Sequence, residues 1–238
     1  MNLREKYGEW GIILGATEGV GKAFAEKIAS EGMSVVLVGR REEMLQELGK
    51  NISETYGVDH MVIRADFAQS DCTDKIFEAT KDLDMGFMSY VACFHTFGKL
   101  QDTPWEKHEQ MINVNVMTFL KCFYHYMGIF AKQDRGAVIN VSSLTAISSS
   151  PYNAQYGAGK SYIKKLTEAV AAECESTNVD VEVITLGTTI TPSPLSNLPG
   201  GPAGEAVMKA AMTPEACVEE AFDNLGKSLS VIAGEHNN

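Results

Sequence analysis

The stretch Gly15-Ala16-Thr17-Glu18-Gly19-Val20-Gly21 joins an apolar run at Trp10–Gly15 to a helical pattern near 19–31. Glycines let a backbone turn tightly and approach a pyrophosphate, and a helix N-terminus offers free N–H groups and positive potential. The spacing is G-x-x-x-G-x-G rather than the common G-x-G-x-x-G. A turn of this kind in the first strand–helix unit favours a nucleotide site, although glycines there can also serve packing alone. We assign Gly15, Thr17, Gly19, Val20 and Gly21 to that site.

Apolar runs alternate with helical stretches along the rest of the chain. We expect strands at Trp10–Gly15, Ser34–Gly39, His60–Ala65, Phe87–Ala92, Ala137–Ser142, Asp180–Leu186 and Leu229–Ala233, and helices near 19–31, 42–56, 71–82, 104–131 and 152–176. Strands that are apolar throughout are typical of a parallel sheet covered on both faces. The sequence therefore predicts an α/β fold, in which residues 1–238 form one Rossmann-like domain with a doubly wound parallel sheet of about seven strands and helices on both faces.

Composition excludes several classes of protein. The net charge of −11 over 238 residues argues against nucleic acid and against anionic membrane surfaces as partners. The N-terminus has no signal-peptide core, and no apolar run reaches the length of a membrane span. The five cysteines are scattered without a C-x-x-C pair, which is typical of reduced thiols in a cytoplasmic protein. The five histidines lack metal-ligand spacing, so we expect no metal.

The end of the second expected strand indicates which nicotinamide cofactor is used. It reads Val38-Gly39-Arg40-Arg41, where NAD sites commonly place an acidic residue that binds the ribose 2′-hydroxyl. Arg40 and Arg41 could instead bind a 2′-phosphate through bidentate hydrogen bonds, which favours NADP(H). Both could also be solvated and balanced by neighbouring glutamates. Asp66, after the third strand, fits equally an adenine contact and a turn residue.

Tyr156 and Lys160 have the spacing Y-x-x-x-K, which places both on one face of a helix. A nearby cation favours tyrosinate, so we expect Lys160 to lower the phenol pKa toward neutrality. Such a phenol can exchange a proton with an alcohol or ketone while a cofactor exchanges the hydride. Ser142 and Ser143 both precede Tyr156, and either could be the catalytic serine by composition. The spacing of thirteen residues to Tyr156 favours Ser143.

The glycine turn, Asn115, Ser143 and the Tyr156–Lys160 pair occur in the order and spacing of the short-chain dehydrogenase/reductase superfamily, which the chain resembles over nearly its whole length. The stretches 85–99, 101–109 and 183–189 further resemble bacterial 7β-hydroxysteroid dehydrogenases. Those enzymes use NADP(H) on the 7-position of bile acids such as ursodeoxycholate and 7-oxolithocholate.

The resemblance implies a role for each catalytic residue. Tyr156 is the general acid/base, Lys160 lowers its pKa and holds the nicotinamide ribose, Ser143 binds the substrate oxygen, and Asn115 orders a water. By the same resemblance, Thr189 is expected to bind the cofactor. Superfamily members pair through their fourth and fifth helices, so we expect a homodimer or homotetramer.

We name His95, Asn153 and Leu195 with Ser143 as substrate contacts, although His95 could equally be structural. Cys93 fits a small buried hydrophobe better than a reactive thiol. The segment at about 191–210 is rich in proline and glycine, and we expect a substrate lid there rather than a plain surface loop. Two alternative functions stay open: a reductase of another carbonyl, such as a 3-oxoacyl thioester, and a non-catalytic NADP sensor.

Overall fold

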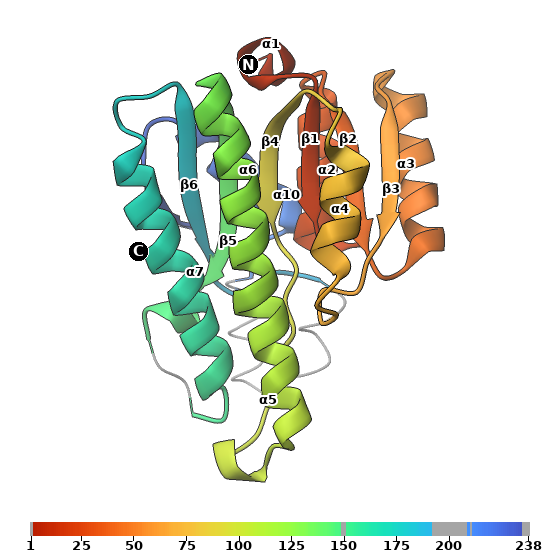
Figure 1. Ribbon diagram of the computed structural model, residues 1–238. Coiled ribbons are helices and arrows are strands. Elements are labelled where there is room, and N and C mark those ends of the chain that lie inside the picture. The colour runs from red at the N-terminus through yellow and green to blue at the C-terminus, as the bar shows by residue number, and fades with distance from the viewer. Residues whose placement is uncertain (1, 149–150, 192–208, 210, 235–238) are drawn as a thin grey trace.

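Seven parallel strands form one sheet in the order β3-β2-β1-β4-β5-β6-β7 in the computed structural model, which describes residues 2–148, 151–191, 209 and 211–234 (Figure 1). The five strands β1, β2, β4, β5 and β6 are built largely from buried apolar or β-branched residues, whereas β3 and β7 are mostly half-buried. The strands are β1 (Trp10–Leu14), β2 (Ser34–Gly39), β3 (His60–Arg64), β4 (Met85–Tyr90), β5 (Gly136–Ser143), β6 (Val179–Leu186) and β7 (Ser230–Ile232).

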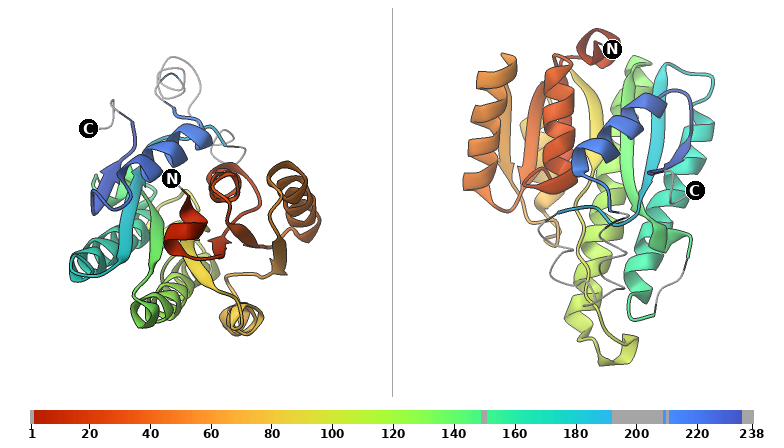
Figure 2. Two further views of the ribbon diagram at one scale, coloured as in Figure 1. Left: turned by 90° about the horizontal axis from the view of Figure 1, so that it is seen from above. Right: turned by 180° about the vertical axis from the view of Figure 1, so that it is seen from behind.

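Helices cover both faces of this sheet, as Figures 1 and 2 show. The helices α2 (Gly19–Ser30), α3 (Glu42–Tyr56) and α10 (Pro214–Asn224) pack on one face. The helices α4 (Cys72–Thr80), α6 (Phe119–Gln133) and α7 (Ala154–Glu173) pack on the other. Each face has its own cluster of buried apolar side chains, so the sheet is the middle layer of three.

The direction of winding reverses beside β1. From β1 the chain builds β2 and β3 on one side, and it then returns to add β4, β5, β6 and β7 on the other. Ligands of open parallel sheets bind outside the carboxyl ends of the strands at such a reversal. The fold therefore places a binding site where β1 and β4 end.

The short helix α1 (Leu3–Tyr7) lies at the end of the sheet where the strands begin, at the top of Figure 1. The buried Tyr7 donates a hydrogen bond of 2.5 Å to Asp180 at the start of β6, and Lys6 pairs with the same carboxylate. These contacts join the N-terminal helix to the amino end of β6, and the expected binding site lies at the other end of the strands.

The predicted fold class is confirmed, and the seven expected strands match within two residues at each end. Two expectations are corrected, and two helices are additional to those expected. The helix expected at 104–131 consists of α5 (Trp105–Ile112), a π-helical segment η2 (Asn113–Thr118) and α6. The helices α1 and α10 were not expected. Cys93 is exposed rather than buried, because it lies in the loop after β4.

Two further expectations fall on residues that the structure does not describe. The lid at about 191–210 lies outside the described residues except for Thr191 and Lys209, and Leu195 lies outside them as well. Among the described residues, no helix combines the length and the apolar character that crossing a membrane requires.

Candidate functional site

A cleft of about 770 Å³ opens at the carboxyl ends of the strands. At one end it is bordered by the turn after β1 and by the end of β2, and at the other by the end of β5 and the start of α7. The cleft brings together most of the residues predicted from the sequence: Gly15, Thr17, Gly19, Val20, Arg40, Arg41, Asp66, His95, Ser143, Asn153, Tyr156, Lys160 and Thr189. Of the remaining described ones, Gly21 lies beneath the turn and Asn115 behind the cleft.

The glycine turn has the close packing that a dinucleotide requires. A Cβ built on Gly21 would lie 1.9 Å from the carbonyl oxygen of Gly15, so the helix can start against the turn only with glycine at 21. Gly19 has φ +57 and opens α2, and a Cβ there would meet Thr191 at 2.7 Å. The N-terminus of α2 therefore borders the cleft with glycine as its first residue, which fits a pyrophosphate of a nicotinamide dinucleotide.

Arg40 and Arg41 lie at the same end of the cleft, directly after β2. Arg41 forms an ion pair of 2.8 Å with Glu18 of the glycine turn. Arg40 is exposed and makes no ion pair with any residue that the structure describes. The positive charges that the sequence indicates are thus available at the cleft, but sequence reasoning missed the carboxylate beside them.

Asp66 makes the turn contact that was one of the two alternatives left open by the sequence, and it also borders the cleft. Its Oδ1 accepts a hydrogen bond of 3.1 Å from the backbone N–H of Ala68, which is a turn contact, and the residue also lines the cleft. The turn contact holds the carboxylate in a fixed position there.

Ser143, Tyr156 and Lys160 meet at the other end of the cleft. Ser143 ends β5, and its hydroxyl is hydrogen-bonded to Tyr156 and accepts a bond of 3.0 Å from the Thr145 hydroxyl. Lys160 Nζ lies 5.9 Å from the centre of the Tyr156 ring and donates to the Val141 carbonyl at 2.8 Å. Ser142 instead donates to the Lys160 carbonyl at 2.9 Å, so its hydroxyl is committed to α7.

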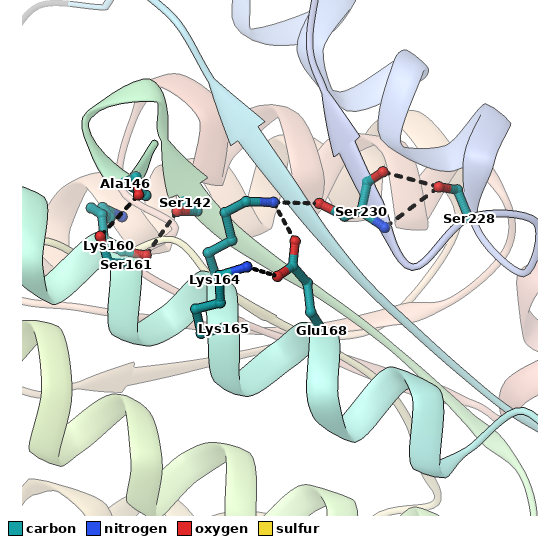
Figure 3. Close-up of polar contacts among 9 residues, drawn as sticks. All are labelled: Ser142, Ala146, Lys160, Ser161, Lys164, Lys165, Glu168, Ser228 and Ser230. Carbon is teal, nitrogen blue, oxygen red and sulfur yellow. Dashed lines mark hydrogen bonds and ion pairs between the residues drawn. The ribbon is translucent and has the colours of Figure 1, made fainter. Parts of the chain in front are cut away.

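Helix α7, which carries Tyr156 and Lys160, is tied to its surroundings along its length (Figure 3). Near its start, Ser161 donates to the Ala146 carbonyl at 3.0 Å. One turn further on, Lys164 pairs with Glu168 and donates at 2.6 Å to the hydroxyl of Ser230 on β7. These bonds, together with that of Ser142, fix the helix against β5 and β7 and so hold the phenol in place.

Burial shifts the pKa values of Tyr156 and Lys160 in opposite directions. It raises the pKa of the Tyr156 phenol above its ordinary value, and the exposed thiol of Cys93 acts in the same direction, while the hydrogen bond with Ser143 lowers it. Burial also lowers the pKa of Lys160. The expectation of a depressed phenol pKa is therefore wrong for the protein by itself. A neutral phenol is a hydrogen-bond donor, which suits protonation of a ketone oxygen.

Asn115 lies in the π-helical segment η2 and is 1% exposed. Its side chain accepts a hydrogen bond of 2.9 Å from the Phe94 N–H and donates one of 2.7 Å to the Phe94 carbonyl. Both polar atoms of the amide are thus used to hold the loop after β4, and a π-helical turn at such a place is typical of functional sites.

The substrate side of the cleft is aromatic and partly polar. The ring of His95 lies 5.4 Å from that of Tyr156 and 5.8 Å from that of Phe97, and burial lowers its pKa, which favours neutral imidazole. Asn153, at the N-cap of α7, is 8% exposed, and its Oδ1 has no hydrogen-bond partner within the described part of the chain. A buried acceptor of this kind at a cleft wall is suited to a ligand hydroxyl. Phe97 was missed from the sequence because aromatic character alone does not separate site from core.

The described residues hold no group of three or more histidine, cysteine or acidic side chains arranged as a metal site.

Comparison with known proteins agrees with this geometry. A family model described as short chain dehydrogenase matches residues 9–196. The chain is 75% identical over 237 residues to 7β-hydroxysteroid dehydrogenases of Mediterraneibacter gnavus and of Collinsella aerofaciens, covering 100% of this chain and 90% of each relative. A solved structure from a study of 7β-hydroxysteroid dehydrogenase stereoselectivity superposes with a TM-score of 0.96 at 75% identity, covering 100% of this chain and 92% of that one. Proteins of this family are oxidoreductases whose Rossmann-like fold binds a nicotinamide cofactor. The chain belongs to the short chain dehydrogenase family.

Proposed function

We propose that this chain is an NADP(H)-dependent 7β-hydroxysteroid dehydrogenase, which interconverts the 7β-hydroxyl and 7-oxo groups of bile acids of the ursodeoxycholate and 7-oxolithocholate type. The observation that carries the proposal is the 75% identity to enzymes of that name over the full chain, which includes the whole described cleft. The hydrogen-bonded Ser143 and Tyr156, with Lys160 beside them, supply the groups that alcohol–ketone interconversion needs.

The nicotinamide supplies or accepts the hydride, and the protein positions the substrate and handles the proton. In reduction, Tyr156 donates its proton to the carbonyl oxygen while Ser143 donates a hydrogen bond to that oxygen as negative charge develops. In oxidation, Tyr156 has to release its proton first, which its raised pKa opposes. Lys160 is held by the Val141 carbonyl with its Nζ 5.9 Å from the centre of the Tyr156 ring, and it can bind the cofactor ribose.

The substrate assignments rest on the cleft wall. His95 and Phe97 offer flat apolar area against which a steroid ring can pack, and the unpaired Oδ1 of Asn153 can accept a bond from a second steroid hydroxyl. Leu195 and the lid at about 191–210 remain predictions. The free cysteines among the described residues support a cytoplasmic location.

Product analysis with 7-oxolithocholate and NADPH tests the proposal. We expect the 7β-epimer as the product, with acetoacetyl thioesters turned over far more slowly. Tyr156→Phe should reduce turnover by several orders of magnitude while NADPH binding, followed by fluorescence, persists. A 7α product, or equal turnover of the thioester, would contradict the assignment.

The preference for NADP(H) has a separate test, because Arg40 and Arg41 are its basis. Replacing both by alanine should weaken binding of NADPH about tenfold or more and that of NADH much less, since two charge-assisted hydrogen-bonding groups are removed from the phosphate alone. Equal losses for both cofactors would exclude the 2′-phosphate site.

A further inference from the structure

Glu18 places a carboxylate among the residues that face the adenosine end of the cofactor. Its Oε1 lies 2.8 Å from Nη2 of Arg41, and both residues line the cleft. Glu18 is the N-cap residue of α2, yet its side chain makes no capping hydrogen bond. The carboxylate therefore pairs with Arg41 and does not cap α2, although α2 begins at the next residue.

This ion pair has little structural value. The side chains are 34% and 49% exposed for Glu18 and Arg41, and ion pairs as exposed as this contribute little to stability. Its consequence for a ligand is larger, because the guanidinium that a 2′-phosphate would bind already has an anionic partner. A phosphate at Arg41 has to share that guanidinium and approach the carboxylate, and like charges at such distances repel.

A free ribose 2′-hydroxyl, unlike a 2′-phosphate, would be attracted by the Glu18 carboxylate. A hydroxyl can donate to a carboxylate, which is the usual contact in NAD sites. In this chain the acidic residue comes from the glycine turn rather than from the end of β2, so it reaches the same end of the cleft from another element.

We propose that Glu18 sets the cofactor balance: it weakens binding of the 2′-phosphate by competing for Arg41, and it strengthens binding of the 2′-hydroxyl as a hydrogen-bond acceptor. Glu18 thereby reduces the NADP(H) preference that Arg40 and Arg41 provide, without abolishing it. This inference rests on the proposed function in one respect, the assignment of Arg40 and Arg41 to the 2′-phosphate.

Calorimetric titration with adenosine 2′,5′-bisphosphate and with 5′-AMP tests the inference without turnover, since the two probes differ at the 2′-position. Glu18→Gln should bind the bisphosphate about three- to tenfold tighter, as expected when one like charge is removed at close range, and should bind 5′-AMP more weakly. Glu47→Gln, at an exposed glutamate further along α3, makes the same change in net charge outside the cleft and should alter neither affinity. A shift of both affinities in the same direction, or no shift, would overturn the role of Glu18.

The Arg41→Ala background tests whether Glu18 acts through Arg41. The tighter bisphosphate binding caused by Glu18→Gln should largely disappear there, and a gain of undiminished size would overturn the competition. The failure of this idea is distinct from failure of the phosphate site. Equal wild-type affinity for the two probes would contradict the site, whereas a wild-type preference that Glu18→Gln leaves unchanged would contradict Glu18 alone.

Discussion

At the scale of single residues, the chemistry depends on a phenol that burial makes a weak acid. Tyr156 is half-buried at the wall of the cleft, where burial raises the pKa of its phenol, and Ser143 provides a hydrogen bond that favours the ionised form. In the proposed mechanism this arrangement keeps the proton on Tyr156 for ketone reduction and makes alcohol oxidation dependent on high pH. Because Ser143 has a single O–H, we expect it to donate to the phenol in the free enzyme and to the substrate oxygen once the substrate is bound.

Ser143→Ala should change both the rate and the pH profile. Loss of one hydrogen-bond donor to the developing oxyanion should lower kcat by about 100-fold. Since the bond also lowers the pKa of Tyr156, its loss should move the rise of the oxidation rate to higher pH. The pH dependence of kcat/KM for oxidation of ursodeoxycholate, which reports the pKa of the free enzyme, measures this shift, with the exposed Ser176→Ala as control. An unmoved or acid-shifted profile would show that Ser143 does not tune the phenol.

Glu182 is a second residue whose charge is set by burial, although it lies in the core. It is fully buried on β6, neither carboxyl oxygen has a hydrogen-bond partner among the described residues, and burial raises its pKa to about 8. A raised carboxyl pKa means that the folded state binds a proton that the unfolded state releases above about 4.5. The contribution to stability is thus complete at acid pH and is lost as pH rises to about 8.

Glu182→Met removes this titration at similar volume. The variant should gain stability relative to wild type as pH rises between about 4.5 and 8, by at most roughly 1.4 kcal/mol per pH unit. Urea unfolding at pH 5.5 and at pH 8.5 measures the difference, and the exposed Glu175→Met provides the control. The same stability difference at both pH values would mean that Glu182 is ionised in the folded protein.

At the scale of elements, the interruption of the long helix before α6 determines the shape of the site. The π-helical segment η2 places the Asn115 amide against the Phe94 backbone. Helix α7 packs closely against Asn115 as well, since a Cβ on Gly159 would lie 3.3 Å from the Asn115 Cβ. The loop after β4 is thereby joined to the helix layer. This loop also carries His95 and Phe97, so its position fixes one wall of the cleft.

Asn115→Ala should destabilise the protein and release this loop. Two buried hydrogen bonds are lost and the Phe94 backbone groups lose their partners, which costs about 2–4 kcal/mol. Urea unfolding measures the loss, and hydrogen exchange at the Phe94 amide should accelerate locally. Asn51→Ala, on the exposed face of α3, should change neither. Unchanged protection of the Phe94 amide would contradict the proposed role of the amide clamp.

The sequence predicts regular elements well here and irregular ones poorly. The strands were found because buried parallel strands are apolar throughout, whereas η2 has the same spacing of apolar residues as an ordinary helix and leaves no separate signal. Helix α10 was missed despite its Thr213 cap and Pro214 at its first position, which are recognisable start signals. The Glu18–Arg41 pair could not be predicted, because it joins two different strand–helix turns and depends on their packing.

At the scale of the whole molecule, the distribution of apolar surface bears on assembly. The outer face of the helix layer formed by η2, α6 and α7 exposes Met117, Tyr124 and Tyr162, with Tyr124 81% exposed, and the Tyr162 ring contacts Phe119 of α6 from the side. Exposed aromatic and methionine side chains gathered on one face are typical of protein interfaces. With a net charge of −11, two copies repel at long range, so apolar burial has to provide the association.

We therefore expect a homodimer or homotetramer that uses this face, and Tyr124→Glu should disrupt it. The substitution adds a negative charge at the centre of an apolar contact, where an unpaired charge is costly to bury. Sedimentation velocity at micromolar concentration should give a multiple of 25.9 kDa for the wild type and a shift toward 25.9 kDa for the variant. Tyr56→Glu, at the end of α3 on the far edge of the sheet, makes the same change elsewhere and should leave the mass unchanged. If Tyr124→Glu sediments as the wild type does, subunits associate through a different surface, and if the wild type itself sediments as a monomer, the expected assembly is wrong.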